Sequence, residues 1–293
     1  MAGRDSRPLF VLDSLNENSI LTARFSNYLV DSRRDGLYIC AHLEPKQLPE
    51  FQYGYQLESG SLLVSLCNLH LDTTGKDQRA ATNAIIDWCK KYAHPYYLDY
   101  CTLGQYDWRQ RSDADYWDTI VNVLENYEFP LQQMLDDLLK LYEDTEILRR
   151  FSCVRANEPI TRKLPNTERA QQYENIGNLE EKAQLRIMER FISELPRTSL
   201  ALLIDEVGDF KMQPRFMSVF DAAYYSLARL SITPAEHTSE YGEPLPIGVC
   251  DCCGRLFVKN GNRQKFCDDI ECKKERNRRK SRTAYLHKKE QQS

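Results

Sequence analysis

The chain has 293 residues, of which 42% are hydrophobic, 11% aromatic and 28% charged, which is typical of one large globular domain or of such a domain with an appendage. Its 12 Gly and 12 Pro exclude collagen-like and low-complexity classes, and no apolar run approaches the length of a membrane span. The formal net charge is −4. Because the start of the chain lacks a signal-peptide apolar region, we expect a cytoplasmic protein with no membrane partner.

Hydrophobic patterning predicts a mainly α (α+β) fold with a small sheet near the start of the chain. The first half is expected to contain strands at 9–12, 37–40 and 62–66, then helices over about 77–94, 114–125 and 130–142. The second half is expected to contain a long connection over 155–178, a helix over 179–195 and a helix from Pro214 to Leu230. We therefore divide the chain into a helical body (1–235), a linker (236–248) and a C-terminal segment (249–293), called the finger below.

The ten cysteines are unevenly distributed. Five lie in apolar contexts and are expected to be inert, mostly buried thiols: Cys40, Cys67, Cys89, Cys101 and Cys153. The other five fall within 23 residues: Cys250, Cys252, Cys253, Cys267 and Cys272. Because a cytosolic chain should not hold structural disulfides, this cluster indicates metal binding.

Four of the clustered cysteines have the spacing of a closed structural zinc site. The pattern is C-x2-C, thirteen residues, then C-x4-C, with Cys250, Cys253, Cys267 and Cys272 as ligands of one Zn2+. Cys252 is left as a spare thiol that points outward. Two alternatives remain open: a redox switch in which Cys252 enters the site, and two reduced pairs that hold no metal.

The residues around the ligands predict a knuckle, a hairpin and then a helix, which is the treble-clef order. Gly254 relieves the steric cost of a tight turn after the first pair. Residues 256–258 are expected to form a strand that turns at 260–262 and returns from Lys265. Asp268 and Asp269 are expected to cap a helix that contains Cys272.

The finger has a charge opposite to that of the rest of the chain. Residues 250–293 hold 13 Lys and Arg against 6 Asp and Glu, a net charge of +7, whereas residues 1–249 have a net charge of −11. A basic segment beside an acidic body indicates a polyanion partner, and the charge alone leaves both DNA and RNA open. The predicted contacts lie on the last helix: Lys273, Lys274, Arg276, Asn277, Arg278, Arg279, Lys280 and Arg282.

The finger resembles the CGNR zinc finger of bacterial transcription regulators. The shared pattern is Cys253-Gly254, the strand 256–258, residues 263–267 (Arg-Gln-Lys-Phe-Cys), and Cys272 followed by a basic helix. In that family the finger follows a mostly helical ABATE domain, so the resemblance implies a DNA-binding finger on a body that senses a ligand or binds a partner.

We therefore expect a bacterial, DNA-binding transcriptional regulator whose body binds a small ligand or a protein, or dimerises. A protein–protein adaptor with a purely structural zinc is the first alternative, and an enzyme acting on nucleic acid is the second. The five histidines form no ligand-spaced pair, and no phosphate-binding glycine loop or nucleophile motif occurs, so no catalytic residue is predicted.

Overall fold

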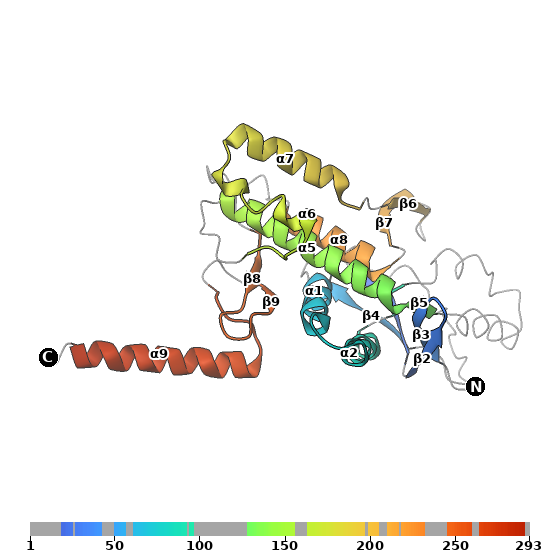
Figure 1. The fold of residues 1–293 in the computed structure, drawn as a ribbon, viewed down its shortest axis with the longest axis horizontal. Helices are drawn as coiled ribbons and strands as arrows, with labels where there is room; N and C mark the ends of the chain where they lie inside the picture. Colours follow the sequence, from blue (N-terminus) through green and yellow to red (C-terminus); the bar gives the residue numbers. More distant parts are fainter. Residues whose placement is uncertain are drawn as a thin grey trace, which may run out of the picture. The chain divides into compact units, whose positions relative to one another are not determined.

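The computed structural model of the chain describes residues 19–25, 27–42, 50–56, 61–92, 94–96, 128–155, 163–196, 199–204, 210–216, 218–231, 245–259 and 264–290. Helices predominate among them, with short antiparallel strands, so the mainly α fold class is confirmed (Figure 1). The predicted strand at 9–12, the predicted helix at 114–125 and Cys101 lie outside the described residues. No described helix is both long enough and apolar enough to cross a bilayer.

The chain divides into two compact units, one of residues 1–142 with 189–229 and the other of residues 143–188 with 230–293. Helix α5 (Leu131–Arg155) and helix α7 (Glu181–Glu194) each contribute residues to both units. The predicted division into body, linker and finger stays a prediction, because a compact unit need not fold on its own.

Among the described residues, the first unit contains three small antiparallel sheets and several helices, including the end of α7. In the first sheet, β1 (Ser19–Arg24) pairs with β4 (Glu50–Gln56). In the second, β3 (Gly36–His42) lies between β2 (Asn27–Arg33) and β5 (Glu128–Pro130). In the third, β6 (Ser199–Ile204) pairs with β7 (Phe210–Arg215). The helices are α1 (Ser61–Thr73), α2 (Gln78–Lys91), the start of α5 and most of α8 (Val219–Ser231). The predicted strand at 37–40 is thus confirmed within β3.

The predicted strand at 62–66 is wrong, because these residues begin helix α1. The buried side chains Leu62, Leu66 and Leu69 recur every three or four residues, as a helix requires. A five-residue window was too short to separate this period from that of a strand. Helix α2 agrees with the prediction, and Asp77 caps it by accepting a hydrogen bond from the backbone amide of Ala80 at 2.8 Å.

The predicted helix start at Pro214 is also wrong. Pro214 lies in strand β7, where it pairs with Leu200 of β6. Helix α8 begins instead at Val219, after a capping box in which Ser218 and Asp221 each accept the other's backbone amide, at 3.0 and 3.1 Å. The proline therefore belongs to a strand, and the serine that follows sets the helix start.

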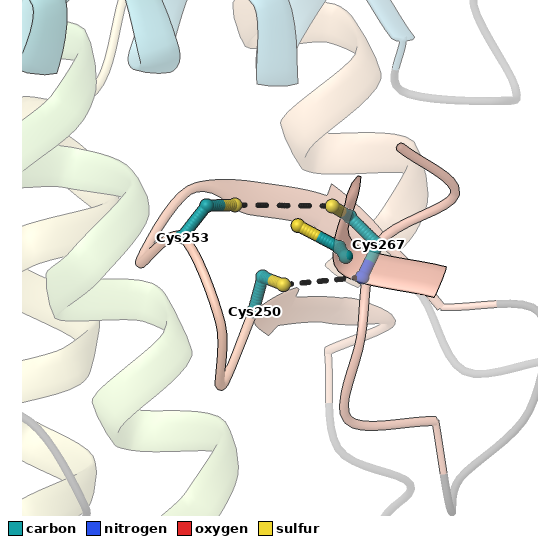
Figure 2. Close-up of side chains that lie close together, drawn as sticks. Cys250, Cys253 and Cys267 are labelled. Carbon is teal, nitrogen blue, oxygen red and sulfur yellow. Dashed lines mark hydrogen bonds between the residues drawn. The ribbon is translucent and has the colours of Figure 1, made fainter. Parts of the chain in front are cut away.

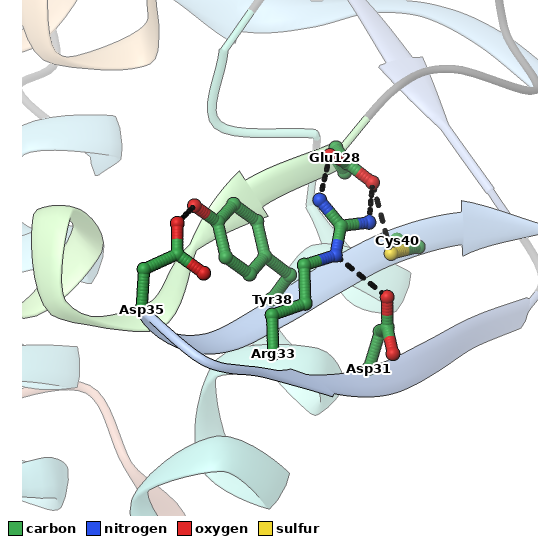
Figure 3. A network of polar contacts seen from close by, with 6 residues as sticks. All are labelled: Asp31, Arg33, Asp35, Tyr38, Cys40 and Glu128. Atoms are coloured by element: carbon green, nitrogen blue, oxygen red, sulfur yellow. Dashed lines mark hydrogen bonds and ion pairs between the residues drawn. The ribbon is translucent and has the colours of Figure 1, made fainter.

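The exposed end of the β2–β3 hairpin carries a polar network that also includes strand β5 (Figure 3). Arg33 forms a bidentate ion pair with Glu128 of β5, donates to Asp31 at 2.7 Å, and lies 4.2 Å from the centre of the Tyr38 ring. Hydrogen bonds from Arg33 hold the pKa of Glu128 below its usual value. The network fixes the short strand β5 against the hairpin, and half-buried Cys40 lies beside it, 3.6 Å from Glu128.

His94 is enclosed by aromatic rings in the first unit. Its ring stacks on Tyr28 at 6.2 Å and meets Phe25 and Phe129 edge-on, and its side chain is almost completely buried. The Nδ1 atom lies 2.7 Å from the carbonyl oxygen of Tyr96, to which it can only donate. Burial outweighs this hydrogen bond and lowers the pKa of His94 to about 3.

The buried imidazole predicts that acid destabilises the fold well above pH 4. In the unfolded chain His94 titrates near pH ~6.5, so between that value and about 3 only the unfolded state takes up the proton. The free energy of unfolding should therefore fall by about 2 kcal/mol between pH 8 and pH 5 because of this residue. His94→Phe should remove that part of the pH dependence in urea titrations, whereas His42→Phe, at an exposed histidine, should keep it. Equal pH dependence in wild type and His94→Phe would show that His94 is not held neutral.

The second unit is organised around the C-terminal half of α5. Every residue from 141 to 148 is buried, including the acidic residues Glu143, Asp144 and Glu146. Helix α6 (Glu168–Gln171) and the short 3-10 helix at Ile176–Asn178 interrupt what was predicted to be a plain connection over 155–178. The unit also contains strands β8 (Ile247–Val249) and β9 (Leu256–Val258) and helix α9 (Ile270–Glu290).

Buried arginine–carboxylate pairs hold this connection against α5. Arg169 of α6 contacts Asp144 at 2.5 Å and Glu143 at 3.5 Å. Arg150 donates to the carboxylate of Glu174 at 3.0 Å and also to its backbone carbonyl oxygen. The pairs act together with apolar contacts, such as the edge-on contact between Phe151 and Tyr173.

Candidate metal centre

The four predicted ligands come together in the second unit. The sulfur atoms of Cys250, Cys253, Cys267 and Cys272 all lie within 4.8 Å of one another, and each thiol is free of any disulfide. Figure 2 shows Cys253 and Cys267 facing each other with their sulfur atoms 3.8 Å apart. A tetrahedral site with Zn–S bonds of ~2.3 Å has sulfur atoms about 3.8 Å apart. The cluster therefore fits one metal ion of that size.

Two segments of the chain supply the ligands in pairs. Cys250 and Cys253 lie in the turn between β8 and β9, and Cys267 and Cys272 flank the start of α9. The Asp251 amide donates to the carbonyl oxygen of Lys265 at 2.9 Å, and the Cys267 amide donates to the sulfur of Cys250 at 3.4 Å. These bonds join the two halves of the site.

The first ligand pair lies in a tight turn that Gly254 permits. The amide of Gly254 donates to the carbonyl oxygen of Cys250 at 2.9 Å, and its φ of 71° lies in the left-handed region. A side chain there would be strained, so the predicted role of this glycine is confirmed. Gly248 has a different role, because a Cβ atom at that position would lie only 2.8 Å from the ring of Phe257.

The predicted hairpin has a different partner strand. Strand β9 is formed as expected, but it pairs with β8, which precedes the first ligand pair, through Val249–Leu256, Gly248–Phe257 and Ile247–Val258. The two first ligands therefore lie inside the hairpin turn rather than before it. The short apolar run at 247–249 was the available signal, but the predicted boundary between linker (236–248) and finger (249–293) divided it.

The predicted cap of the last helix is confirmed. The carboxylate of Asp269 accepts the backbone amides of Glu271 at 2.9 Å and Cys272 at 3.4 Å, as an N-cap does. Cys272 is thereby fixed in the first turn of α9 and is buried there. The direction in which α9 leaves the cluster is set by this cap and by the ligand beside it.

The thiols have unequal proton affinities. Burial acts to raise the pKa of Cys250, but hydrogen bonds from the amides of Cys253, Cys267 and Cys252 outweigh it and lower the pKa to about 6. Burial raises the pKa of Cys267 to about 11 and also raises that of Cys272. Four thiolates so close together repel one another, so a bound cation is what allows all four to be deprotonated.

The metal cluster provides most of the core of this small region. Its buried side chains are Cys250, Phe257 and Cys272, with Phe266 and Cys267 packed against them. Such a core is too small to fold unaided, which is typical of sites where metal binding supplies the folding free energy. Cys252 is exposed, as the sequence predicted for the spare thiol.

The predicted nucleic-acid contacts all lie on α9, and two groups of them differ in setting. Arg276 is half-buried, and Arg279, although exposed, has its guanidinium 5.4 Å from the centre of the Phe266 ring. The remaining predicted contacts are exposed as well: Lys273, Lys274, Asn277, Arg278, Lys280 and Arg282. The contact between Arg279 and Phe266 was not predicted from the sequence.

No protein-family model, curated protein or solved structure matches the chain. What the protein does must therefore follow from the site itself. The resemblance to CGNR-type fingers stays a prediction that concerns the finger alone.

Proposed function

We propose that the protein is a zinc-dependent, DNA-binding transcriptional regulator without catalytic activity. One observation carries the proposal: helix α9 begins inside the four-cysteine cluster and presents a row of exposed cations beyond it. Kinship with CGNR-type finger proteins, and a ligand- or partner-binding role for the body, are parts of the same proposal.

The cations of α9 are available to phosphates despite their ion pairs. Lys274 pairs with Glu271 at 2.7 Å and Arg278 pairs with Glu275 at 2.8 Å, but both basic side chains are more than 60% exposed. Ion pairs of that kind contribute at most about 1 kcal/mol, so a phosphate can replace the carboxylate. Among the described residues, Lys280 and Arg282 have no ion-pair partner at all.

Removal of three exposed cations should weaken binding to any duplex. We expect the variant Arg278→Ala, Lys280→Ala, Arg282→Ala to reduce the slope of log affinity against log salt by up to ~2.7, about 0.9 per lost phosphate contact. Arg279 is kept because it packs on Phe266. The measurement is a gel-shift salt titration of the full-length, zinc-loaded protein, and Lys182→Ala on α7, an exposed cation outside the finger, is the control.

Equal slopes for wild type and the triple variant would contradict the proposed contacts. Absence of any binding by wild type at low salt would favour the adaptor instead, with the basic helix docking on an acidic protein. Mass spectrometry of the incubated nucleic acid addresses the remaining alternative, since an enzyme would leave it chemically altered.

A further inference from the structure

We propose that helix α7 packs antiparallel against the same helix of a second copy of this chain. The contact surface, called the α7 strip below, consists of the exposed side chains of Leu185 and Ile192, with Lys182 and Glu189 along one edge. This goes beyond the proposed function, because it concerns how two chains associate and holds whether or not the protein binds DNA.

The apolar centre of the strip is unusually exposed. Three of the seven large hydrophobic side chains that are exposed among the described residues lie on α7 or just before it: Leu185 is 48% exposed, Ile192 52% and Leu179 40%. Leu185 and Ile192 are seven residues apart, so they lie about 20° from each other around the helix and two turns apart along it. They therefore form a continuous line, unlike single exposed hydrophobic residues, which are common on protein surfaces.

This line is not the side through which α7 packs on its own chain. The buried side chain of α7 is Phe191, which lies about 120° from Leu185 and about 100° from Ile192 around the helix. Apolar residues thus occupy two sides of α7, one buried and one exposed. A surface helix normally needs one apolar side to pack on its own core, so the second side indicates another contact.

The edges of the strip differ in charge. Lys182 lies about 60° and Glu189 about 40° from Leu185 on one edge, whereas Glu181 and Met188 lie on the other edge at about 40° and 60°. The side chains of Lys182 and Glu189 are exposed, and among the residues that the structure describes neither has an ion-pair partner. One edge therefore carries a cation and an anion that are both available to a second molecule.

The spacing along the helix axis makes the strip self-complementary. With a rise of about 1.5 Å per residue, Lys182 and Glu189 lie about 5 Å on either side of a midpoint next to Leu185. A two-fold axis through this midpoint places Leu185 against Leu185 of the copy, and each Lys182 against the Glu189 of the other chain. Ile192 then lies at the end of the copy's helix where the exposed Leu179 is found.

This order of charges favours a second copy over another protein. An antiparallel copy provides both ion pairs from residues that the strip already contains, whereas a parallel copy would place Lys182 against Lys182 and Glu189 against Glu189. On the other edge, Glu181 would meet Met188 of the copy, so no like charges face each other there. Contact between identical patches is the arrangement of two-fold dimers, the commonest soluble oligomers.

The test is sedimentation equilibrium of the full-length, zinc-loaded protein, with a reducing agent that keeps the exposed Cys252 from linking chains. At tens of micromolar, we expect wild type to have twice the 34.3 kDa mass of one chain. The variant Leu185→Gln, Ile192→Gln should sediment as a single chain at the same concentration, because it removes the apolar centre of the contact. Its helix content by circular dichroism should equal that of wild type, since both side chains are exposed.

Charge reversal tests the antiparallel pairing. Glu189→Lys turns both ion pairs into repulsions and should raise the dissociation constant of the dimer roughly 5- to 30-fold. Adding Lys182→Glu restores opposite charges and should return the constant to the wild-type value. Lys182→Ala removes only the attraction, so the dimer should persist with a change of roughly 2- to 5-fold. Glu194→Lys, the same charge change about 180° from Leu185 on the same helix, is the control and should change nothing.

Each contrary result has a defined meaning. A wild type that stays a single chain at every concentration would overturn the proposal and leave the strip to a different protein. A dimer that survives Leu185→Gln, Ile192→Gln would also overturn it, because another surface would then join the chains. Loss of the dimer in that variant without an effect of Glu189→Lys would overturn the antiparallel arrangement. Because no DNA is present, all these results leave the proposed function standing.

Discussion

Replacement of Cys267 by Ser is expected to release the metal ion and unfold residues 250–285. Cys267 contacts both halves of the site: its sulfur lies 3.8 Å from that of Cys253, and its amide donates to the sulfur of Cys250. Structural zinc in finger peptides contributes about 10–16 kcal/mol of apparent binding free energy, so losing a ligand removes what holds this small core together. Wild type should carry one zinc per chain after chelator treatment and gel filtration, and the variant should carry almost none.

Hydrogen exchange should show which residues unfold in the Cys267→Ser variant. In Cys267→Ser, the amides of residues 250–259 and of the first turns of α9 should exchange rapidly, because a helix this rich in like charges is marginal without its anchor. Amides of α1 and α2 should stay protected. Cys252→Ser is the matched control, since the exposed Cys252 lies outside the four-sulfur cluster, and its zinc content should equal that of wild type. Full zinc retention by Cys267→Ser would disprove the ligand assignment.

The four-cysteine cluster could be predicted because the residues that define it lie close together in the sequence. Two short pairs of cysteines, a glycine after the first pair and an aspartate before the last helix specify the site within 23 residues, and all of them occupy the predicted positions. The pairing of β9 could not be derived in the same way. Residues 247–249 are an apolar run of only three residues, and the close approach of Phe257 to Gly248, which leaves no room for a Cβ atom, is visible only in the structure.

The helices were predicted correctly where only one side of the helix is apolar. The predictions failed where side chains on several sides of the helix are buried. Helix α2 has its buried residues on one side, and α7 packs through Phe191; in both, the apolar period is visible in the sequence. Helix α1 presents leucines on several sides, so its run resembles a buried strand. Helix α5 continues past Tyr142, where we predicted its end. Beyond that point Glu143 and Asp144 are buried in ion pairs, whereas acidic side chains are usually exposed to solvent.

Arg169→Met is expected to lower the free energy of unfolding by about 3–5 kcal/mol at neutral pH, because it leaves the buried Asp144 and Glu143 without their arginine. Burial acts against the charge of Arg169, but the two carboxylates outweigh it and raise the arginine's pKa. Without the arginine, burial favours the neutral, protonated form of Asp144 over the charged form. The destabilisation by Arg169→Met should therefore diminish toward low pH. Urea unfolding followed by circular dichroism at several pH values measures both effects.

Two further variants decide whether the buried pair is the cause. Combining Arg169→Met with Asp144→Leu should recover much of the lost stability, since an apolar pair of similar volume often replaces a buried ion pair at little cost. Arg190→Met is the control: Arg190 pairs with Glu194 on α7, but its side chain is 77% exposed, so the change should be below ~1 kcal/mol. If Arg169→Met and Arg190→Met destabilise equally, Arg169 does not hold α6 to α5 through buried charge. A double variant less stable than Arg169→Met alone would instead show that Asp144 stabilises the unit through contacts other than its arginine.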